Sequence, residues 1–260
     1  MGALLSIFFT VYFWTSSAVL FTINCFICLL VAPFDPLRRA VHTFSCYWGN
    51  HYFLMNPGWK LSYEGLENID PAKTYVLIAN HQSLADILLL YGLHRYYKWV
   101  SKEEVFKTPI IGWNMFLNQY VEIKRGDMKS IKQMMQTCKN WLNEGASIMI
   151  FPEGTRSRDG ELQPFRDGAF RLAVDTKIPL IPIVIDGTSE LLPKGKLTLA
   201  VHNLIRVKIL PPLTGDQFEN SSGKMRSFVH QQMVDTLAEM RAQRPEIYKK
   251  KDVAAIAPPQ

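Results

Sequence analysis

The chain has 260 residues, is 48% hydrophobic and carries a formal net charge of +6 at pH 7. This length suits one large domain or a domain with an appendage, and the excess of basic residues suits an anionic membrane surface, an anionic substrate or nucleic acid. Nothing in the number or spacing of the four cysteines argues for a fold built on disulfides.

The N-terminal segment is the most apolar part of the chain. No side chain between Met1 and Pro33 is charged. At about 1.5 Å per residue, a helix of this length exceeds the ~30 Å of a bilayer's hydrocarbon core. Its flanks lack the basic start and cleavage site of a secretory signal, so we predict a retained membrane segment. Cys25 and Cys28 have CxxC spacing, but no second pair completes a metal site, so we interpret them as small apolar residues.

A second segment, residues 37–55, combines Arg, His and Asn with many aromatic residues. This mixture predicts an amphipathic helix near the lipid headgroups. The sequence leaves two arrangements open: a spanning helix followed by an interfacial helix, or a hairpin of two helices within one leaflet. Arg38 and Arg39 follow the apolar run, which indicates that the chain from residue 38 onward is cytoplasmic. We therefore expect residues 1–56 to form a two-helix, membrane-associated part.

The rest of the chain alternates apolar runs with helical patterns. This alternation predicts an α/β domain over residues 57–245, with a mostly parallel central sheet flanked by helices, and a C-terminal tail over residues 246–260. The predicted strands are 75–79, 97–100, 119–123, 147–151, 181–185 and 205–210, and the predicted helices are 84–93, 128–143, 168–176 and 222–243.

The stretch "ANHQSLAD" places His81 directly after an apolar run, and Asp86 near the start of the next helix. In open α/β sheets, ligands bind beyond the carboxyl ends of the strands. Histidine titrates near neutral pH, and a nearby carboxylate can orient its ring, so the pair could act as a general base. A structural histidine beside a helix-start aspartate explains the same spacing equally well.

Two further strand ends carry basic residues. The stretch "FPEGTRSR" covers residues 151–158, and "YVEIKRGD" covers residues 120–127. The planar fork of arginine suits phosphate oxygens, although exposed loop charge is the simpler interpretation of each loop alone. Three strand ends with these residues together predict proton transfer beside a bound phosphate.

These stretches resemble the signatures of the membrane glycerolipid acyltransferases. "NHQSLAD" is similar to their Asn-His-x4-Asp signature, and "FPEGTRSR" to their Phe-Pro-Glu-Gly-Thr-Arg signature. "GWNMFLNQYVEIKR" and "IPLIPIVIDGT" look like their intermediate and late blocks. The resemblance covers roughly residues 60–215 and is greatest to the 1-acyl-glycerol-3-phosphate acyltransferases.

The resemblance implies transfer of a fatty acyl group from coenzyme A or acyl carrier protein to the free hydroxyl of lysophosphatidate, giving phosphatidate. His81 would be the general base and Asp86 would orient it. The residues implied to hold glycerol and phosphate are Lys124, Arg125, Glu153, Gly154, Thr155, Arg156 and Pro182. We expect no metal, no other cofactor and no nucleic acid, and we expect anionic membrane lipids as partners of a catalytic domain on the cytoplasmic face.

Other acceptors remain open, because relatives acylate other lysolipids or glycerol 3-phosphate. A non-catalytic, membrane-tethered lipid-binding protein would also explain the apolar segment and the basic charge. A hydrolase built on Ser83 lacks the Gly-x-Ser-x-Gly pattern around the serine, and Cys138 lies within a predicted helix. The chain also lacks the glycine patterns of dinucleotide and P-loop enzymes.

An acyl chain must leave water to be bound, and each buried methylene gains about 0.8 kcal/mol. The apolar stretch "PIIGWNMFL" at residues 109–117 adjoins a motif strand, and so does the helix after Asp86. We expect Trp113, Met115 or Phe116 to limit the length of the bound acyl chain. The alternative is that these side chains simply belong to the core.

Overall fold

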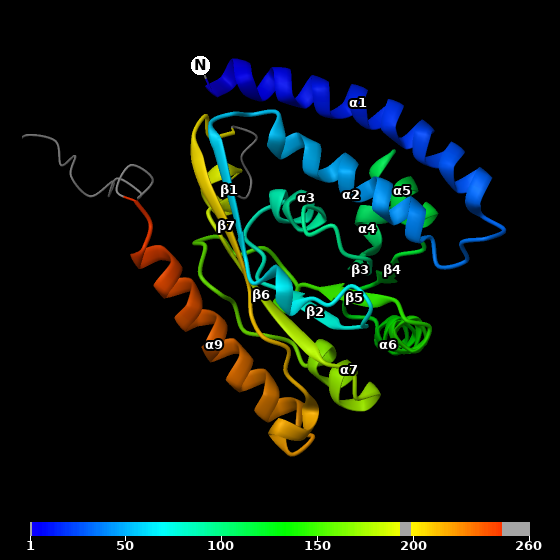
Figure 1. Ribbon diagram of the computed structural model, residues 1–260, viewed down its shortest axis with the longest axis vertical. Coiled ribbons are helices and arrows are strands. Elements are labelled where there is room, and N and C mark those ends of the chain that lie inside the picture. The colour runs from blue at the N-terminus through cyan, green and yellow to red at the C-terminus, as the bar shows by residue number, and fades with distance from the viewer. Residues whose placement is uncertain (1, 193–198, 246–260) are drawn as a thin grey trace, which may run out of the picture.

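The computed structural model describes residues 2–192 and 199–245 of the chain (Figure 1). Within these residues, one sheet has the strand order β1-β7-β6-β2-β5-β3-β4. The strands are β1 Trp59–Glu64, β2 Val76–Ala79, β3 Tyr97–Lys102, β4 Val121–Ile123, β5 Ser147–Ile150, β6 Leu180–Asp186 and β7 Asn203–Ile209. Every neighbouring pair is parallel except β6–β7. The predicted α/β class and mostly parallel sheet are confirmed, whereas the predicted tail at residues 246–260 lies outside the described residues.

Helices cover both faces of this sheet. The helices are α1 Gly2–Val31, α2 Arg39–Leu54, α3 Ala85–Tyr91, α4 Glu103–Phe106, α5 Ile111–Leu117, α6 Met128–Asn143, α7 Gly168–Thr176, α8 Thr188–Leu191 and α9 Ser222–Ala242. Figure 1 shows α1, α2 and α3 on one side of the sheet and α6, α7 and α9 on the other. The structure is therefore a three-layer sandwich, with α1 as an additional outer layer.

The two faces of β2 show how the sequence builds two cores. Side chains alternate along a strand, so Val76 and Ile78 pack with α6, α7 and α9, while Leu77 and Ala79 pack with α2 and α3. All four side chains are fully buried. A strand buried on both faces reads as a continuous apolar run, which is why the sequence identifies the central strands well.

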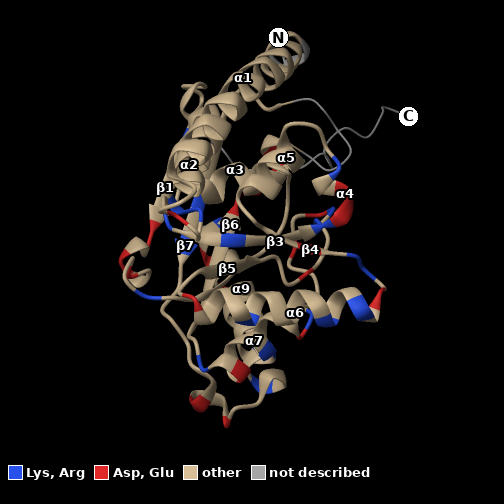
Figure 2. Ribbon diagram, turned by 90° about the vertical axis from the view of Figure 1, so that its right-hand side faces the viewer, with Lys and Arg blue, Asp and Glu red and all other residues tan. Residues whose placement is uncertain are grey.

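The outer face of helix α1 is apolar, and the face that packs against the rest of the structure carries polar side chains. Among the described residues, its Ser6–Val31 part is the one helix that is long and apolar enough to cross a membrane. Figure 2 shows no charged residue along its length. On its inner face, Asn24 is fully buried and donates hydrogen bonds to the side chains of Ser45 in α2 and Asn114 in α5.

The second N-terminal helix packs closely against the rest of the structure. Half of the 16 residues of α2 are buried, because the helix packs between α1 and α3. Tyr52 of α2 is 1% exposed, and its hydroxyl lies within hydrogen-bonding distance of Ser16 and Ser17 of α1. Two N-terminal helices are thus present as predicted, and among the described residues only α1 is a candidate span. The predicted contact of α2 with the lipid headgroups stays a prediction.

A buried lysine bonds the connection between α1 and α2 to the sheet. Nζ of Lys98 in β3 donates to the carbonyl oxygens of Leu37 and Asn118, at 2.8 and 2.7 Å. Burial lowers the pKa of Lys98 to about 7. The connection between α1 and α2 is thereby held against the amino end of β3.

Candidate active site

The loops after β2 and β5 meet at one edge of the sheet, because these strands are parallel neighbours. His81 follows β2, and the loop that begins at Phe151 follows β5. Two hydrogen bonds join the backbone of His81 to this second loop: its N–H donates to Oε1 of Glu153 at 2.7 Å, and its carbonyl accepts from the N–H of Ser157 at 2.8 Å. The structure thus brings the first two sequence signatures together.

The side chains of His81 and Asp86 form the predicted pair. Nδ1 of His81 lies 2.8 Å from Oδ2 of Asp86, and the same oxygen accepts the backbone N–H groups of Gln82 and Ser83 at 2.7 and 2.8 Å. Asp86 is fully buried, whereas the His81 side chain remains 14% exposed. Because a carboxylate oxygen can only accept, the ring proton lies on Nδ1, and Nε2 is left with a lone pair.

Aromatic stacking fixes the plane of the imidazole. The His81 ring lies flat on Phe151, with centroids 3.9 Å apart and planes inclined by 10°. Phe151 in turn stacks on Trp99 of β3, with centroids 5.3 Å apart. The hydrogen bond from His81 to Asp86 and the stacking on Phe151 together leave the ring one orientation.

Glu153 has a different place from the one predicted for it. Its two carboxylate oxygens accept backbone N–H groups, Oε1 from His81 and Oε2 from Gln163 at 3.1 Å. The residue is 4% exposed, and burial raises its pKa to about 7, against the opposing effect of the two N–H donors. A carboxylate enclosed in this way joins the two loops, which argues against its predicted direct contact with an acceptor.

The predicted basic groups lie on two loops at this edge. Arg125 follows β4 and is exposed, as is Lys124, while Arg156 is half-buried in the loop after β5. Partial desolvation by the surrounding loops, and then the charge of Arg166, lower the pKa of Arg125. A side chain at Gly154, which has a φ of 71°, would collide with the guanidinium of Arg166. Arg166 therefore lies between the two basic loops, and sequence reasoning missed it.

The remaining predicted residues divide into exposed and enclosed positions. Thr155 is exposed on the loop after β5. Pro182 is buried inside β6, opposite Ile78 of β2, and the structure does not bring it to the loops. In α5, Trp113 and Phe116 are 53% and 57% exposed, whereas Met115 is 7% exposed and belongs to the core. The predicted acyl-chain role therefore stays open for Trp113 and Phe116, while the core interpretation fits Met115.

The rival nucleophiles are occupied or enclosed. The hydroxyl of Ser83 donates to the carbonyl of Leu192 at 2.8 Å, and the residue is fully buried. Cys138 is fully buried in α6, where burial raises its pKa to about 12. In the described part of the chain, no group of three or more His, Cys, Asp or Glu side chains could hold a metal ion. The expected absence of a cofactor remains a prediction.

Asn80 is a further site residue that sequence reasoning did not single out. Its side-chain amide donates to the carbonyl of Ile185 at 2.9 Å and accepts the N–H of the same residue at 2.7 Å. This two-way pair fastens the loop of His81 to the carboxyl end of β6. Its place directly before His81 in the signature was the available signal.

Comparisons with known proteins agree with this geometry. Residues 60–186 match the family model described as Acyltransferase. A 1-acyl-sn-glycerol-3-phosphate acyltransferase of Pseudomonas aeruginosa is 31% identical over 182 residues, which cover 70% of this chain and 70% of that protein. The crystal structure of the 1-acyl-sn-glycerophosphate (LPA) acyltransferase PlsC from Thermotoga maritima superposes with a TM-score of 0.77 at 27% identity, covering 95% of this chain and 100% of the other.

A chloroplastic protein of the same name from Arabidopsis thaliana is 38% identical over 205 residues, covering 78% of this chain. The match covers 57% of the Arabidopsis protein, and 63% of a similar protein from Chlamydomonas reinhardtii. The chain thus spans less than two thirds of these longer relatives.

Proposed function

Because this chain belongs to the 1-acyl-sn-glycerol-3-phosphate acyltransferase family, we propose that it transfers an acyl group from a thioester to the free hydroxyl of lysophosphatidate. The observation that carries the proposal is the His81–Asp86 pair at the carboxyl end of β2. The printed names of the relatives support lysophosphatidate as the acceptor. Coenzyme A and acyl carrier protein both fit as the carrier of the donor.

The geometry of His81 supports a general-base mechanism. Nε2 takes the proton of the acceptor hydroxyl while the hydroxyl oxygen attacks the thioester carbonyl. Asp86 stabilises the imidazolium that forms, because its Oδ2 already accepts the Nδ1 proton. The tetrahedral intermediate then collapses: the C–S bond breaks, and the proton on Nε2 passes to the departing thiolate. The products are the ester and the free thiol, and no covalent acyl-enzyme is needed.

The two basic loops support binding of the acceptor's phosphate. Arg156 lies on the loop that is hydrogen-bonded to the backbone of His81, and Arg125 lies on the loop after β4. Two guanidinium forks can hold a phosphate while its glycerol hydroxyl reaches Nε2. Arg166, between these loops, adds a third positive charge to the same edge.

The placement of α1 supports association with the membrane from one side. Ser6 and Asn24 of α1, and Leu37 in the connection to α2, all bond to the domain, so α1 is held at both ends. Its outer face carries exposed apolar side chains from Leu4 to Leu30. These contacts favour the earlier alternative of a helical pair within one leaflet. Positive charge after α1 favours the cytoplasmic face.

An acceptor panel tests the proposed function. The purified full chain is incubated with labelled acyl-CoA or acyl carrier protein thioester, and with lysophosphatidate, glycerol 3-phosphate or other lysophospholipids. We expect phosphatidate from lysophosphatidate, and none with the His81→Ala variant. Preference for another acceptor would reassign the substrate within the family. Lipid binding without turnover by the wild-type chain would favour the non-catalytic alternative.

A further inference from the structure

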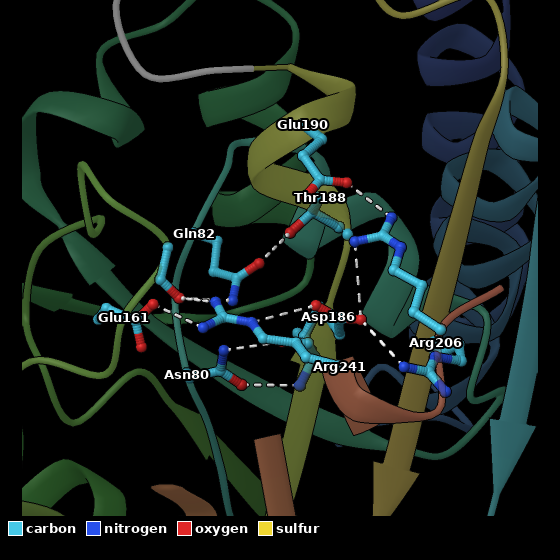
Figure 3. Close-up of polar contacts among 12 residues, drawn as sticks. Asn80, Gln82, Glu161, Asp186, Thr188, Glu190, Arg206 and Arg241 are labelled. Carbon is cyan, nitrogen blue, oxygen red and sulfur yellow. Dashed lines mark hydrogen bonds and ion pairs between the residues drawn. The ribbon is translucent and has the colours of Figure 1, made fainter. Parts of the chain in front are cut away.

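A polar network joins the C-terminal end of α9 to the loop that carries His81 (Figure 3). At its centre is the carbonyl oxygen of Gly160, which accepts two hydrogen bonds. One comes from Nε2 of Gln82 at 3.0 Å and the other from a guanidinium nitrogen of Arg241 at 2.7 Å. Arg241 also donates to Oε1 of Glu161 at 2.6 Å. The side chain of Arg241 in α9 therefore bonds to two consecutive residues, Gly160 and Glu161, in the loop after β5.

These hydrogen bonds connect Arg241 to the His81–Asp86 pair. Gln82 is the residue after His81, and its backbone N–H donates to Oδ2 of Asp86, the oxygen that also accepts from His81. Its side chain reaches across to Gly160, and its Oε1 lies 3.4 Å from the hydroxyl of Thr188. A short series of hydrogen bonds thus runs from Arg241 through Gly160 and Gln82 to the His–Asp pair.

Asp186, at the end of β6, anchors the other side of the network. Its carboxylate lies 3.2 Å from Arg206, 3.6 Å from Arg241 and 3.8 Å from Arg244, and it is 2% exposed. Arg244 is also paired with Glu190 at 2.6 Å. The three guanidinium groups face three carboxylates, those of Asp186, Glu190 and Glu161, so the cluster is balanced in charge. It is therefore built to hold protein segments together rather than to bind an anion.

We propose that Arg241 is a positioning residue for acyl transfer. It holds the loop after β5, which carries Arg156, at a fixed distance from the loop that carries His81. This inference rests on the proposed function, because it concerns the alignment of an acceptor bound by one loop with a base on the other. Without the hydrogen bonds from Arg241, the loop after β5, which is proposed to bind phosphate through Arg156, can move relative to Nε2 of His81. The acceptor's hydroxyl then spends less time in line with the base.

The test compares three variants of the full chain. Arg241→Gln removes the fork but leaves Asp186 paired with Arg206 and Arg244, so the buried carboxylate stays compensated. Arg241→Lys keeps the charge and one donor toward Gly160. The matched control is Arg226→Gln: Arg226 lies on the same helix, is 39% exposed against 32% for Arg241, and pairs with Asp167 at 3.7 Å.

We expect Arg241→Gln to lower kcat/KM for lysophosphatidate by about tenfold or more while the KM for the acyl donor changes less than about twofold. Arg241→Lys should recover part of this loss, and Arg226→Gln should match the wild type. Equal kinetics for Arg241→Gln and Arg226→Gln would overturn the proposal. So would a loss that affects donor and acceptor alike and is not rescued by lysine. If Arg241→Gln fails to fold, the lysine variant carries the same acceptor-selective comparison.

Hydrogen–deuterium exchange separates this inference from the proposed function. Faster exchange in residues 79–86 and 152–163 of Arg241→Gln, but not of Arg226→Gln, supports the positional coupling even if the wild-type chain transfers no acyl group. In that case the proposed function fails, but the inference that Arg241 holds these two loops in place stands. Unchanged exchange in both segments overturns the coupling, whatever the activity.

Discussion

The backbone N–H of His81 donates to Oε1 of Glu153 at 2.7 Å, so the two signature loops are joined by a carboxylate rather than by a shared substrate alone. The second oxygen of Glu153 accepts from the N–H of Gln163. At pH 5 the Glu153 carboxyl is protonated, and its hydroxyl oxygen can still accept an N–H, whereas the –NH2 of glutamine cannot accept, so one of the two N–H groups would be left unpaired. We expect Glu153→Gln to lower the free energy of unfolding at pH 5 by about 1–3 kcal/mol.

The same carboxyl predicts a pH dependence of stability. The pKa of Glu153 is raised from 4.5 to about 7, so between these values the folded state binds more protons than the unfolded state. Its stabilising contribution is therefore complete below pH 4.5 and is lost as the pH rises through about 7. Urea unfolding in detergent at several pH values should show this slope in the wild type and not in Glu153→Gln. Retention of the slope in the variant would contradict the assignment, and the exposed Glu67→Gln serves as the control.

Loss of the proposed catalytic pair should strongly reduce turnover without affecting folding. His81→Ala removes the group proposed to accept the hydroxyl proton and should lower kcat by about two to four orders of magnitude. Asp86→Asn should also lower kcat, and the double variant should be no worse than His81→Ala, because the two residues act as one unit. Steady-state kinetics with lysophosphatidate checks both expectations. More than a tenth of wild-type turnover in His81→Ala would exclude the general-base role.

Phe151 should act through the orientation of the His81 ring. Their planes are inclined by 10°, and an aromatic contact of this kind is worth about 0.5–1.5 kcal/mol. We expect Phe151→Leu to lower kcat up to about tenfold with little change in KM, and Phe151→Tyr, which keeps the aromatic face, to remain near the wild type. Equal activity of the leucine and tyrosine variants would show that stacking is unimportant.

Arg156 should affect the acceptor more than the donor. Lysine keeps the charge but loses the planar fork that holds two phosphate oxygens. We expect Arg156→Lys to raise the KM for lysophosphatidate by roughly tenfold and to leave the KM for the acyl donor nearly unchanged. Arg158→Lys, an exposed position in the same loop, is the control. A donor-selective defect would mean that this loop binds the thioester instead.

The outer face of α1 should determine membrane binding. Val19 and Phe26 are 61% and 62% exposed on that face, so lysine at both positions leaves the inner contacts intact. We expect the double variant to lose more than about tenfold in partitioning to anionic vesicles, measured by flotation. The matched control places lysines at Met128 and Phe228, exposed apolar positions in α6 and α9 on the opposite side of the sheet. Equal binding of the two double variants would exclude α1 as the contact with lipid.

The sequence predicts the central strands and the pairing of His81 with Asp86, because both depend on local pattern. The apolar run before His81 can be recognised from the local sequence, without knowing which distant segments pack against it. Strand β1 was missed although its stretch "WKLSYE" alternates apolar with polar residues, as a half-buried edge strand does, because it lacks the continuous apolar run of the central strands. Helices α4 and α8 have four residues each and α5 has seven, too few for a helical period to be recognised.

Partners distant in the sequence could not be predicted. A glutamate among basic loop residues reads as a ligand for substrate, and only the tertiary structure shows that Glu153 bonds to a residue 72 positions earlier. Lys98 reads as an exposed charge in a strand, yet it is buried beneath the connection between α1 and α2. In both cases the function of the side chain is decided by segments that pack together only after folding.

Asn24 gives the N-terminal helix a dependence on events that occur later in synthesis. Its buried side-chain NH2 group donates to Oδ1 of Asn114, 90 residues further along the chain. When α1 leaves the ribosome, that partner has not yet been made, so this hydrogen bond can form only later. Docking of α1 is therefore completed only after α5 has been synthesised. A generic membrane anchor grafted in its place would attach the domain to a bilayer, but it would leave Ser45 and Asn114 without the amide that they are arranged to receive.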